Sequence, residues 1–243
     1  MKIAVAQMPI VMGDERRNVR TLFEFARAAA RKRCDVAVFP ECALSGWLAP
    51  TKGESIPGDV TERLSELAQK NKMAIVAGIA ERDGGRLYNS AVLIDRRGRV
   101  LLKHRKINEL EIGLRLYGRG ESLATAEFEG RRVALTICAD SWVPEITDAL
   151  YRMGARIIFS PSAWAIDRGG EACNLAWIAA TYEQRTSARD LAIVAPNSVG
   201  RVTLGPWRGK ILQGDSLAFG PGGKKLLQGP RNRAALLTLR LKP

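Results

Sequence analysis

Three polar side chains, Glu41, Lys106 and Cys138, each stand where a segment that is apolar enough to form a buried strand comes to an end. A carboxylate beside a thiol can take its proton, and an ammonium group can balance both the carboxylate and a developing oxyanion. A charge removed from water is costly unless it is paired. Each of these three placements is therefore unfavourable alone but favourable if the three side chains lie together. The set predicts nucleophilic chemistry by a thiol, with a carboxylate as the base.

The segment around Cys138 reads as a strand, a sharp turn and the start of a helix. Residues 133–137 are mostly apolar and β-branched, Pro144 suits a first helical turn, and Glu145 suits the positive end of a helix dipole. Backbone N–H groups and the dipole at such a turn can favour a thiolate. A buried cysteine is more often an inert hydrophobic side chain, so this segment alone leaves both interpretations open.

Glu41 and Lys106 also have simpler interpretations when each is taken alone. The apolar segment 35–41 ends in Pro40 and Glu41, and a carboxylate at a strand exit is usually solvated. In the segment 98–108, alternation places Lys106 on the same face as Val100, Leu102 and His104. That face predicts an inward lysine, although a lysine at a strand end can also bend toward water.

Composition limits the possible classes of protein. The 243 residues can bury a sizeable core, and 46% hydrophobic with 26% charged residues is ordinary for a soluble globular protein. No apolar run approaches the roughly 20 residues of a membrane span, and no signal-peptide cleavage site follows the N-terminal strand. We therefore expect a cytoplasmic protein that does not bind membranes.

The cysteines and the histidine restrict the chemistry further. Four cysteines include no C-x-x-C pair, and His104 is the one histidine, which excludes zinc sites of the usual spacing. A Ser–His–Asp or Cys–His mechanism would have to use His104, which argues against both. The sequence predicts a reaction without a metal or another cofactor, in which a group other than histidine takes the thiol proton.

The net charge of +13 raises the question of nucleic-acid binding. The basic residues are spread along the chain, their densest groups are interrupted by acidic or apolar residues, and no nucleic-acid-binding motif accompanies them. A dispersed, solvated surface is the preferred interpretation, so we expect no specific nucleic-acid partner.

Hydrophobic periodicity predicts one domain, residues 1–243, of alternating strands and helices with antiparallel hairpins. Helices are expected at 18–33, 61–71, 144–154 and 175–189. Strands are expected at 3–7, 35–41, 73–80, 87–95, 98–108, 133–137, 156–160, 191–196, 213–219, 224–227 and 234–241.

An ordered set of motifs resembles the nitrilase-superfamily carbon–nitrogen hydrolases, in the branch of amidases and carbamoylases. The set comprises residues 3–7, FPE at 39–41, RKIN at 105–108, ICADSWVPE at 137–145, GARIIFSPSAW at 154–164 and GDSLAFGPGGKKL at 214–226. The resemblance implies an α/β fold, a four-layer αββα sandwich with mixed sheets, and assembly into a homodimer or larger homo-oligomer. It also implies that Glu41 is the general base, Lys106 the cation for the tetrahedral intermediate and Cys138 the nucleophile, with the backbone N–H of Ala139 as a second oxyanion donor.

The sequence departs from the family pattern after the cysteine. Many amidase-type members have Arg-Phe-Pro-Glu there, whereas this chain has Trp142-Val-Pro-Glu145, so Trp142 is expected to reshape the pocket. The family often has a second acidic residue between the lysine and the cysteine; Glu111 and Glu109 are the candidates, with a weak preference for Glu111.

The same motifs bear on the substrate. The resemblance implies amides rather than nitriles, because this chain has Cys-Ala-Asp at 138–140 where nitrile-cleaving members usually have Cys-Trp-Glu. Trp47, Trp142, Trp164 and Arg168 could line a pocket or serve only as packing or surface residues. The expected reaction is hydrolysis of a small linear amide or N-carbamoyl compound through an acyl-thioenzyme. Acyl transfer to an amine, and an inactive basic binding protein on the same fold, are the alternatives.

Overall fold

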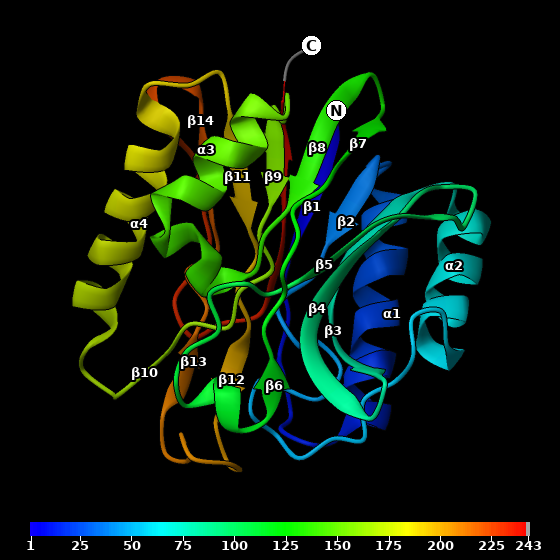
Figure 1. Ribbon diagram of the computed structural model, residues 1–243, viewed down its shortest axis with the longest axis vertical. Helices are drawn as coiled ribbons and strands as arrows, with labels where there is room; N and C mark the ends of the chain where they lie inside the picture. Colours follow the sequence, from blue (N-terminus) through cyan, green and yellow to red (C-terminus); the bar gives the residue numbers. More distant parts are fainter. Residues whose placement is uncertain (242–243) are drawn as a thin grey trace.

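The computed structural model describes residues 1–241, and these residues form four layers. Helices α1 (Glu15–Arg31) and α2 (Asp59–Asn71) cover one β-sheet, and helices α3 (Pro144–Arg152) and α4 (Glu171–Ser187) cover another (Figure 1). The two sheets pack face to face between the helical layers. The expected αββα sandwich with mixed sheets is confirmed.

In the first sheet the strand order is β16-β1-β2-β3-β4-β5, with β6 paired to β4. Strands β1, β2 and β3 run parallel, and the remaining neighbours on the main path are antiparallel. Because β4 reverses the direction of β3 and β5 reverses it again, β5 runs the same way as β2. The strands are β1 (Lys2–Gln7), β2 (Val36–Val38), β3 (Ala74–Asp83), β4 (Arg86–Ile94), β5 (Val100–Arg105), β6 (Tyr117–Gly118) and β16 (Ala235–Arg240).

In the second sheet the order is β15-β14-β11-β9-β8-β7, with β8, β9 and β11 parallel. A smaller sheet has the order β10-β13-β12. The second sheet contains β7 (Thr125–Phe128), β8 (Arg131–Leu135), β9 (Ile157–Phe159), β11 (Ala192–Ala195), β14 (Leu217–Gly220) and β15 (Lys224–Gln228). The smaller sheet contains β10 (Ala165–Ile166), β12 (Val199–Arg201) and β13 (Ile211–Gln213), and short 3₁₀ turns lie at η1 (Gly113–Arg115), η2 (Cys138–Trp142) and η3 (Pro221–Gly223).

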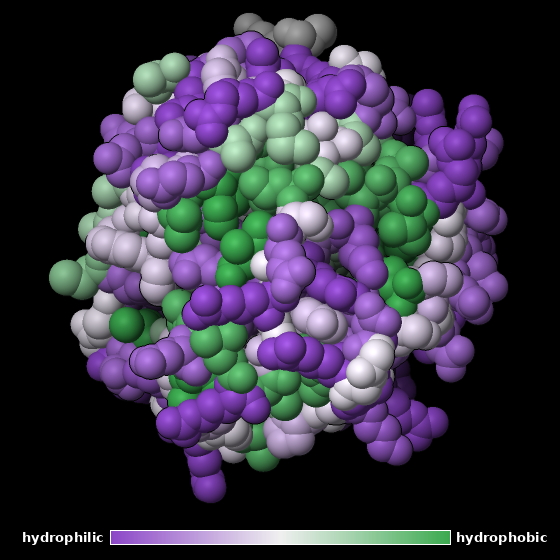
Figure 2. Space-filling view, in the orientation of Figure 1, coloured by the Kyte–Doolittle hydropathy of each residue, from purple (hydrophilic) through white to green (hydrophobic). Residues whose placement is uncertain are grey.

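Alternation along β1 shows why this chain forms stacked layers. Ile3 and Val5 point into the core between the two sheets, whereas Ala4 and Ala6 point into the core beneath α1 and α2. A strand that is apolar on both faces must be covered on both faces. Figure 2 shows hydrophobic residues gathered across the middle of one face of the molecule, with hydrophilic side chains over most of the rest.

Several expected elements have different bounds. The expected strand 213–219 is split between β13 and β14, which belong to different sheets, because Gly214 and Asp215 both adopt positive φ angles of 73° and 52°. The expected strands 35–41 and 98–108 are also shorter, so Glu41 and Lys106 lie beyond the ends of β2 and β5. In residues 1–241 we find no helix long and apolar enough to cross a membrane.

Candidate active site

Glu41, Lys106 and Cys138 come together in one buried site between the two sheets. Glu41 follows β2 and Lys106 follows β5, which run in the same direction, and Cys138 follows β8 of the second sheet. Their exposed fractions are 1%, 1% and 6%. The inward direction of Lys106 that alternation predicted is therefore correct, and the solvated alternatives for Glu41 and Lys106 are excluded.

Glu41 is held against the first sheet by a close approach of two backbones. A Cβ atom at Gly78 of β3 would lie 2.6 Å from the Glu41 Cα atom, so glycine is what lets the turn after β2 lie flat on β3. Oε1 of Glu41 accepts hydrogen bonds from Asn89 Nδ2 at 2.6 Å and Lys106 Nζ at 2.8 Å. No described residue donates a hydrogen bond to the buried Oε2 atom, which leaves this oxygen able to accept a proton.

Lys106 lies between two carboxylates. Its Nζ atom is 2.8 Å from Glu41 Oε1 and 3.4 Å from Glu109 Oε1, and it sits 5.1 Å from the centre of the Trp47 ring. Burial by itself would lower the pKa of Lys106, but the adjacent carboxylates of Glu41 and Glu109 outweigh it and raise the pKa above the usual lysine value. The ammonium group therefore stays charged at neutral pH.

The second acidic residue beside the lysine is Glu109, and Glu111 is exposed. The weak preference for Glu111 does not agree with this geometry, because the chain turns after β5 and brings position 109 back onto Lys106. Glu109 also accepts hydrogen bonds from Asn89 Nδ2 at 3.1 Å and from the Leu110 backbone N–H at 3.0 Å. Burial raises the pKa of Glu109, while Lys106 opposes that rise.

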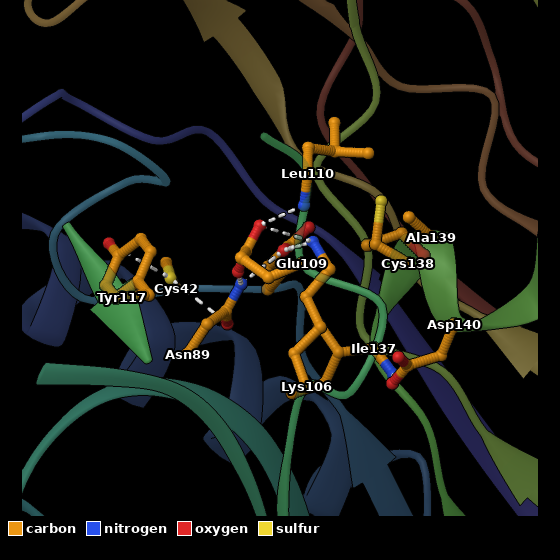
Figure 3. Close-up of polar contacts among 12 residues, drawn as sticks. Cys42, Asn89, Lys106, Glu109, Leu110, Tyr117, Ile137, Cys138, Ala139 and Asp140 are labelled. Carbon is orange, nitrogen blue, oxygen red and sulfur yellow. Dashed lines mark hydrogen bonds and ion pairs between the residues drawn. The ribbon is translucent and has the colours of Figure 1, made fainter. Parts of the chain in front are cut away.

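Cys138 begins η2 with a φ angle of 48°, a left-handed conformation that is uncommon outside glycine. Its backbone N–H donates to the Pro161 carbonyl at 3.0 Å, which ties the turn to the segment after β9. Figure 3 shows the Cys138 sulfur and the Asp140 carboxylate pointing in opposite directions. The left-handed turn therefore places the Cys138 sulfur on one side and the Asp140 carboxylate on the other.

Asp140 supports this turn through four donors. Its carboxylate accepts hydrogen bonds from the backbone N–H groups of Ile137, Ile107 and Asn108 at 2.9, 3.0 and 2.8 Å, and His104 Nε2 lies 2.8 Å away. These contacts fix the segment that carries Lys106 relative to the turn that carries Cys138. Sequence reasoning did not assign this role, although the inward parity of His104 was a signal that it needed a buried partner.

The thiol of Cys138 is held in its neutral form. Burial and the charge of Glu41 raise its pKa well above the usual thiol value, and Lys106 and the backbone N–H of Ala163 oppose the rise only in part. Burial therefore opposes the stabilisation of a thiolate that a helix N-terminus could give. The helix α3 begins only at Pro144, and η2 is too short to offset the loss of water around the sulfur.

The three side chains open into a cavity of about 160 Å³. Of the four residues that the sequence left open between pocket and packing or surface roles, Trp47, Trp142 and Trp164 line this cavity, whereas Arg168 is exposed and lines a different hollow. Ala139 is fully buried beside Cys138, and its carbonyl accepts a hydrogen bond from Asn108 Nδ2 at 2.7 Å. Within residues 1–241 no cluster of three or more His, Cys, Asp or Glu side chains is arranged to hold a metal ion.

Comparison with known proteins agrees with the motifs. A family model described as carbon–nitrogen hydrolase matches residues 2–242. An (R)-stereoselective amidase from a Pseudomonas species is 30% identical over 237 residues, which cover 96% of this chain and 82% of that protein. The human omega-amidase NIT2 is 30% identical over 165 residues, or 63% of this chain and 60% of the omega-amidase.

Solved structures share the fold. An amidase variant from Nesterenkonia sp. AN1, which carries an acrylamide adduct at its own active-site cysteine, superposes with a TM-score of 0.86. The match covers 100% of this chain and 93% of that chain, at 21% identity. Because the family model spans nearly the whole sequence, the chain belongs to the carbon–nitrogen hydrolase family.

Proposed function

We propose that this protein hydrolyses a small linear amide or N-carbamoyl compound through a covalent acyl-thioenzyme. The observation that carries the proposal is the arrangement of Cys138, Glu41 and Lys106 around one cavity, with a free carboxylate oxygen on Glu41. The amidases among its relatives support an amide as the substrate class. The roles proposed are nucleophile for Cys138, general base for Glu41 and cation for Lys106.

The first half of the reaction forms the thioester. Glu41 Oε2 takes the thiol proton as the Cys138 sulfur attacks the amide carbon, and the oxyanion that forms is stabilised by Lys106. The backbone N–H of Ala139 is the proposed second donor to this oxyanion. The C–N bond then breaks as Glu41 returns the proton to the leaving nitrogen, which departs as ammonia or an amine.

The second half of the reaction releases the acid. Glu41 takes a proton from water, the hydroxide attacks the thioester carbon, and the C–S bond breaks as the proton passes to the Cys138 sulfur. The sum is amide plus water giving carboxylic acid plus ammonia or amine. A thiol whose pKa is raised needs such a base, and His104 is already engaged by Asp140.

The two alternatives from the sequence are weighed by the same site. An inactive binding protein would have no use for three buried ionisable side chains at strand ends, so the intact set argues against it. Acyl transfer to an amine uses the same first half-reaction, and only the acceptor differs. A cytoplasmic location and a homodimer or larger homo-oligomer remain part of the proposal, on the sequence and the family resemblance.

The experiment is a panel of amides and N-carbamoyl compounds incubated with purified protein, followed by assay of ammonia and by rapid quench with intact-mass measurement. We expect stoichiometric ammonia or amine and an acyl adduct that is absent in Cys138→Ala, with Cys173→Ala as the matched control that keeps activity. We also expect Glu41→Gln to slow both half-reactions. Turnover by Cys138→Ala would overturn the proposal.

A further inference from the structure

All five tryptophans of the chain line the cavity that holds Cys138. They come from five separate segments: the turn after β2, the end of η2, the loop before β10, helix α4 and the loop between β12 and β13. Twelve residues line this cavity, so the tryptophans make up nearly half of its wall. The rings are Trp47, Trp142, Trp164, Trp177 and Trp207.

The five rings form two groups, and the rings within each group are in contact. Trp142 and Trp164 stack with centroids 5.8 Å apart, and Trp177 stands edge-on to both. Trp207 packs edge-on against Trp47, with centroids 4.7 Å apart. Such offset and edge-to-face contacts give the wall a fixed shape, into which a further flat ring can pack favourably.

Packing alone would not favour indoles here. The Nε1 atoms of Trp47 and Trp142 are buried and have no hydrogen-bond partner among residues 1–241. A buried donor without a partner is unfavourable, and phenylalanine would fill similar space without it. Trp177 is 48% exposed although it is large and apolar, which places an indole at the rim where solvent reaches the cavity.

The charged residues of the cavity argue against a substrate that carries a carboxylate. Glu41 and Lys106 are the charged residues among the lining, and each is engaged by the other and by Asn89 or Glu109. Asn174 donates its amide to Gln213 at 2.6 Å. A substrate carboxylate would therefore enter an apolar cavity without a cation of its own, which is costly.

We infer that the substrate of the proposed hydrolysis is an uncharged amide carrying an aromatic ring, with the ring seated in the tryptophan-lined cavity. The inference rests on the proposed function for the reaction and on the tryptophans for the ring. A cavity of about 160 Å³ fits this class, since an apolar cavity of roughly 150 Å³ accepts a benzene molecule. Amides bearing a carboxylate, including N-carbamoyl amino acids, are the disfavoured class.

Binding can be tested without turnover, because the intrinsic tryptophan fluorescence of this protein comes only from residues lining the cavity. In Cys138→Ala, benzamide and phenylacetamide should change the emission saturably at millimolar concentration. Glutaramate and N-carbamoylphenylalanine, which carry a carboxylate, should leave it unchanged. Saturable binding of the two acids but not of the neutral arylamides would overturn the inference.

Turnover tests the inference separately. For the unmodified protein, kcat/KM should be higher for phenylacetamide than for propionamide, and Trp177→Ala should reduce that ratio by about tenfold, the scale of one lost aromatic contact. Phe23→Leu, which replaces an aromatic residue packed under Arg63 outside the cavity, should leave the ratio unchanged. Efficient turnover of propionamide without a preference for arylamides would refute the ring-binding role of the cavity but leave the proposed hydrolysis intact. Arylamide binding without turnover of any amide would refute the proposed hydrolysis but leave the ring-binding role intact.

Discussion

Replacing Lys106 by methionine removes the cation from the centre of the site and preserves the length of the side chain. Lys106 is 1% exposed and contacts carboxylates on two sides, at 2.8 Å and 3.4 Å. Lys106→Met therefore leaves Glu41 and Glu109 facing each other in a buried space. Removing one partner of a buried ion pair typically costs about 3–5 kcal/mol in the free energy of unfolding, and we expect that range at neutral pH.

The stability loss in Lys106→Met should depend on pH with a definite sign. Burial already raises the pKa of Glu109, and the loss of Lys106, which opposes the rise, lets it rise further. A carboxyl whose folded-state pKa lies above its unfolded value binds protons more readily when folded, so the penalty is relieved as the pH falls and grows as the pH rises through the folded pKa. Urea unfolding near pH 5 and near pH 8 should show the smaller deficit at the lower pH.

The rate of Lys106→Met should fall at least ~100-fold, or ~2.7 kcal/mol in barrier height, which is the scale of one lost oxyanion donor. The matched control is Lys103→Met, on β5 and three residues before Lys106. Lys103 pairs with Glu81 at 2.6 Å, but it is partly exposed and Arg105 also pairs with Glu81. We expect the control to lose less than ~1 kcal/mol of stability and to keep its turnover. Near-normal turnover in a folded Lys106→Met protein would remove this residue from the mechanism.

Three further predictions follow from other features. Asp140→Asn should destabilise the protein and abolish an acid-sensitive part of its stability in urea titrations. Burial would raise the pKa of Asp140, but its hydrogen bonds lower it, so its contribution to stability is present above the unfolded carboxyl pKa and lost as the pH falls through the folded pKa. An unchanged pH profile of stability would contradict this. Prolonged EDTA treatment should leave turnover unchanged, and loss of activity restored by zinc would contradict the mechanism. Binding to nucleic acid should be weak, indifferent to sequence and lost in moderate salt, which a filter-binding salt titration measures; tight binding to one sequence at physiological salt would contradict it.

Alternation and apolar runs were sufficient for most of the fold. The strand containing Ile3 and Val5 and the inward parity of Lys106 both follow from side chains that alternate between two faces. The αββα arrangement itself came from the motif resemblance, since local periodicity does not say which sheet faces which. The division of 213–219 between two sheets depends on backbone angles at Gly214 and Asp215 that sequence alone did not suggest.

The candidate site was predicted less completely. Taken alone, Glu41 is more plausibly solvated, and only the motif resemblance places it beside the lysine. The contact with Gly78 that holds Glu41 in place joins residues 37 positions apart, so the local sequence does not reveal it. Sequence spacing left Glu109 and Glu111 both open, with a weak preference for Glu111, because the turn after β5 decides which carboxylate reaches Lys106. Trp177 and Trp207 gave no signal either, since they meet the other tryptophans only once α4 and a distant loop fold onto the cavity.

The burial of Cys138 explains why the proposed mechanism uses three groups rather than a thiolate alone. Removing water raises the pKa of the Cys138 thiol, so in the proposed mechanism this thiol is neutral at rest and depends on Glu41 to accept its proton. The same removal of water strengthens the attraction between Lys106 and an oxyanion, because charges interact more strongly in a medium of low dielectric constant. Burial therefore weakens the free thiol and strengthens the stabilisation of the transition state. In the proposed mechanism, Glu41 as the base compensates for the first effect, and the fixed ammonium group of Lys106 makes use of the second.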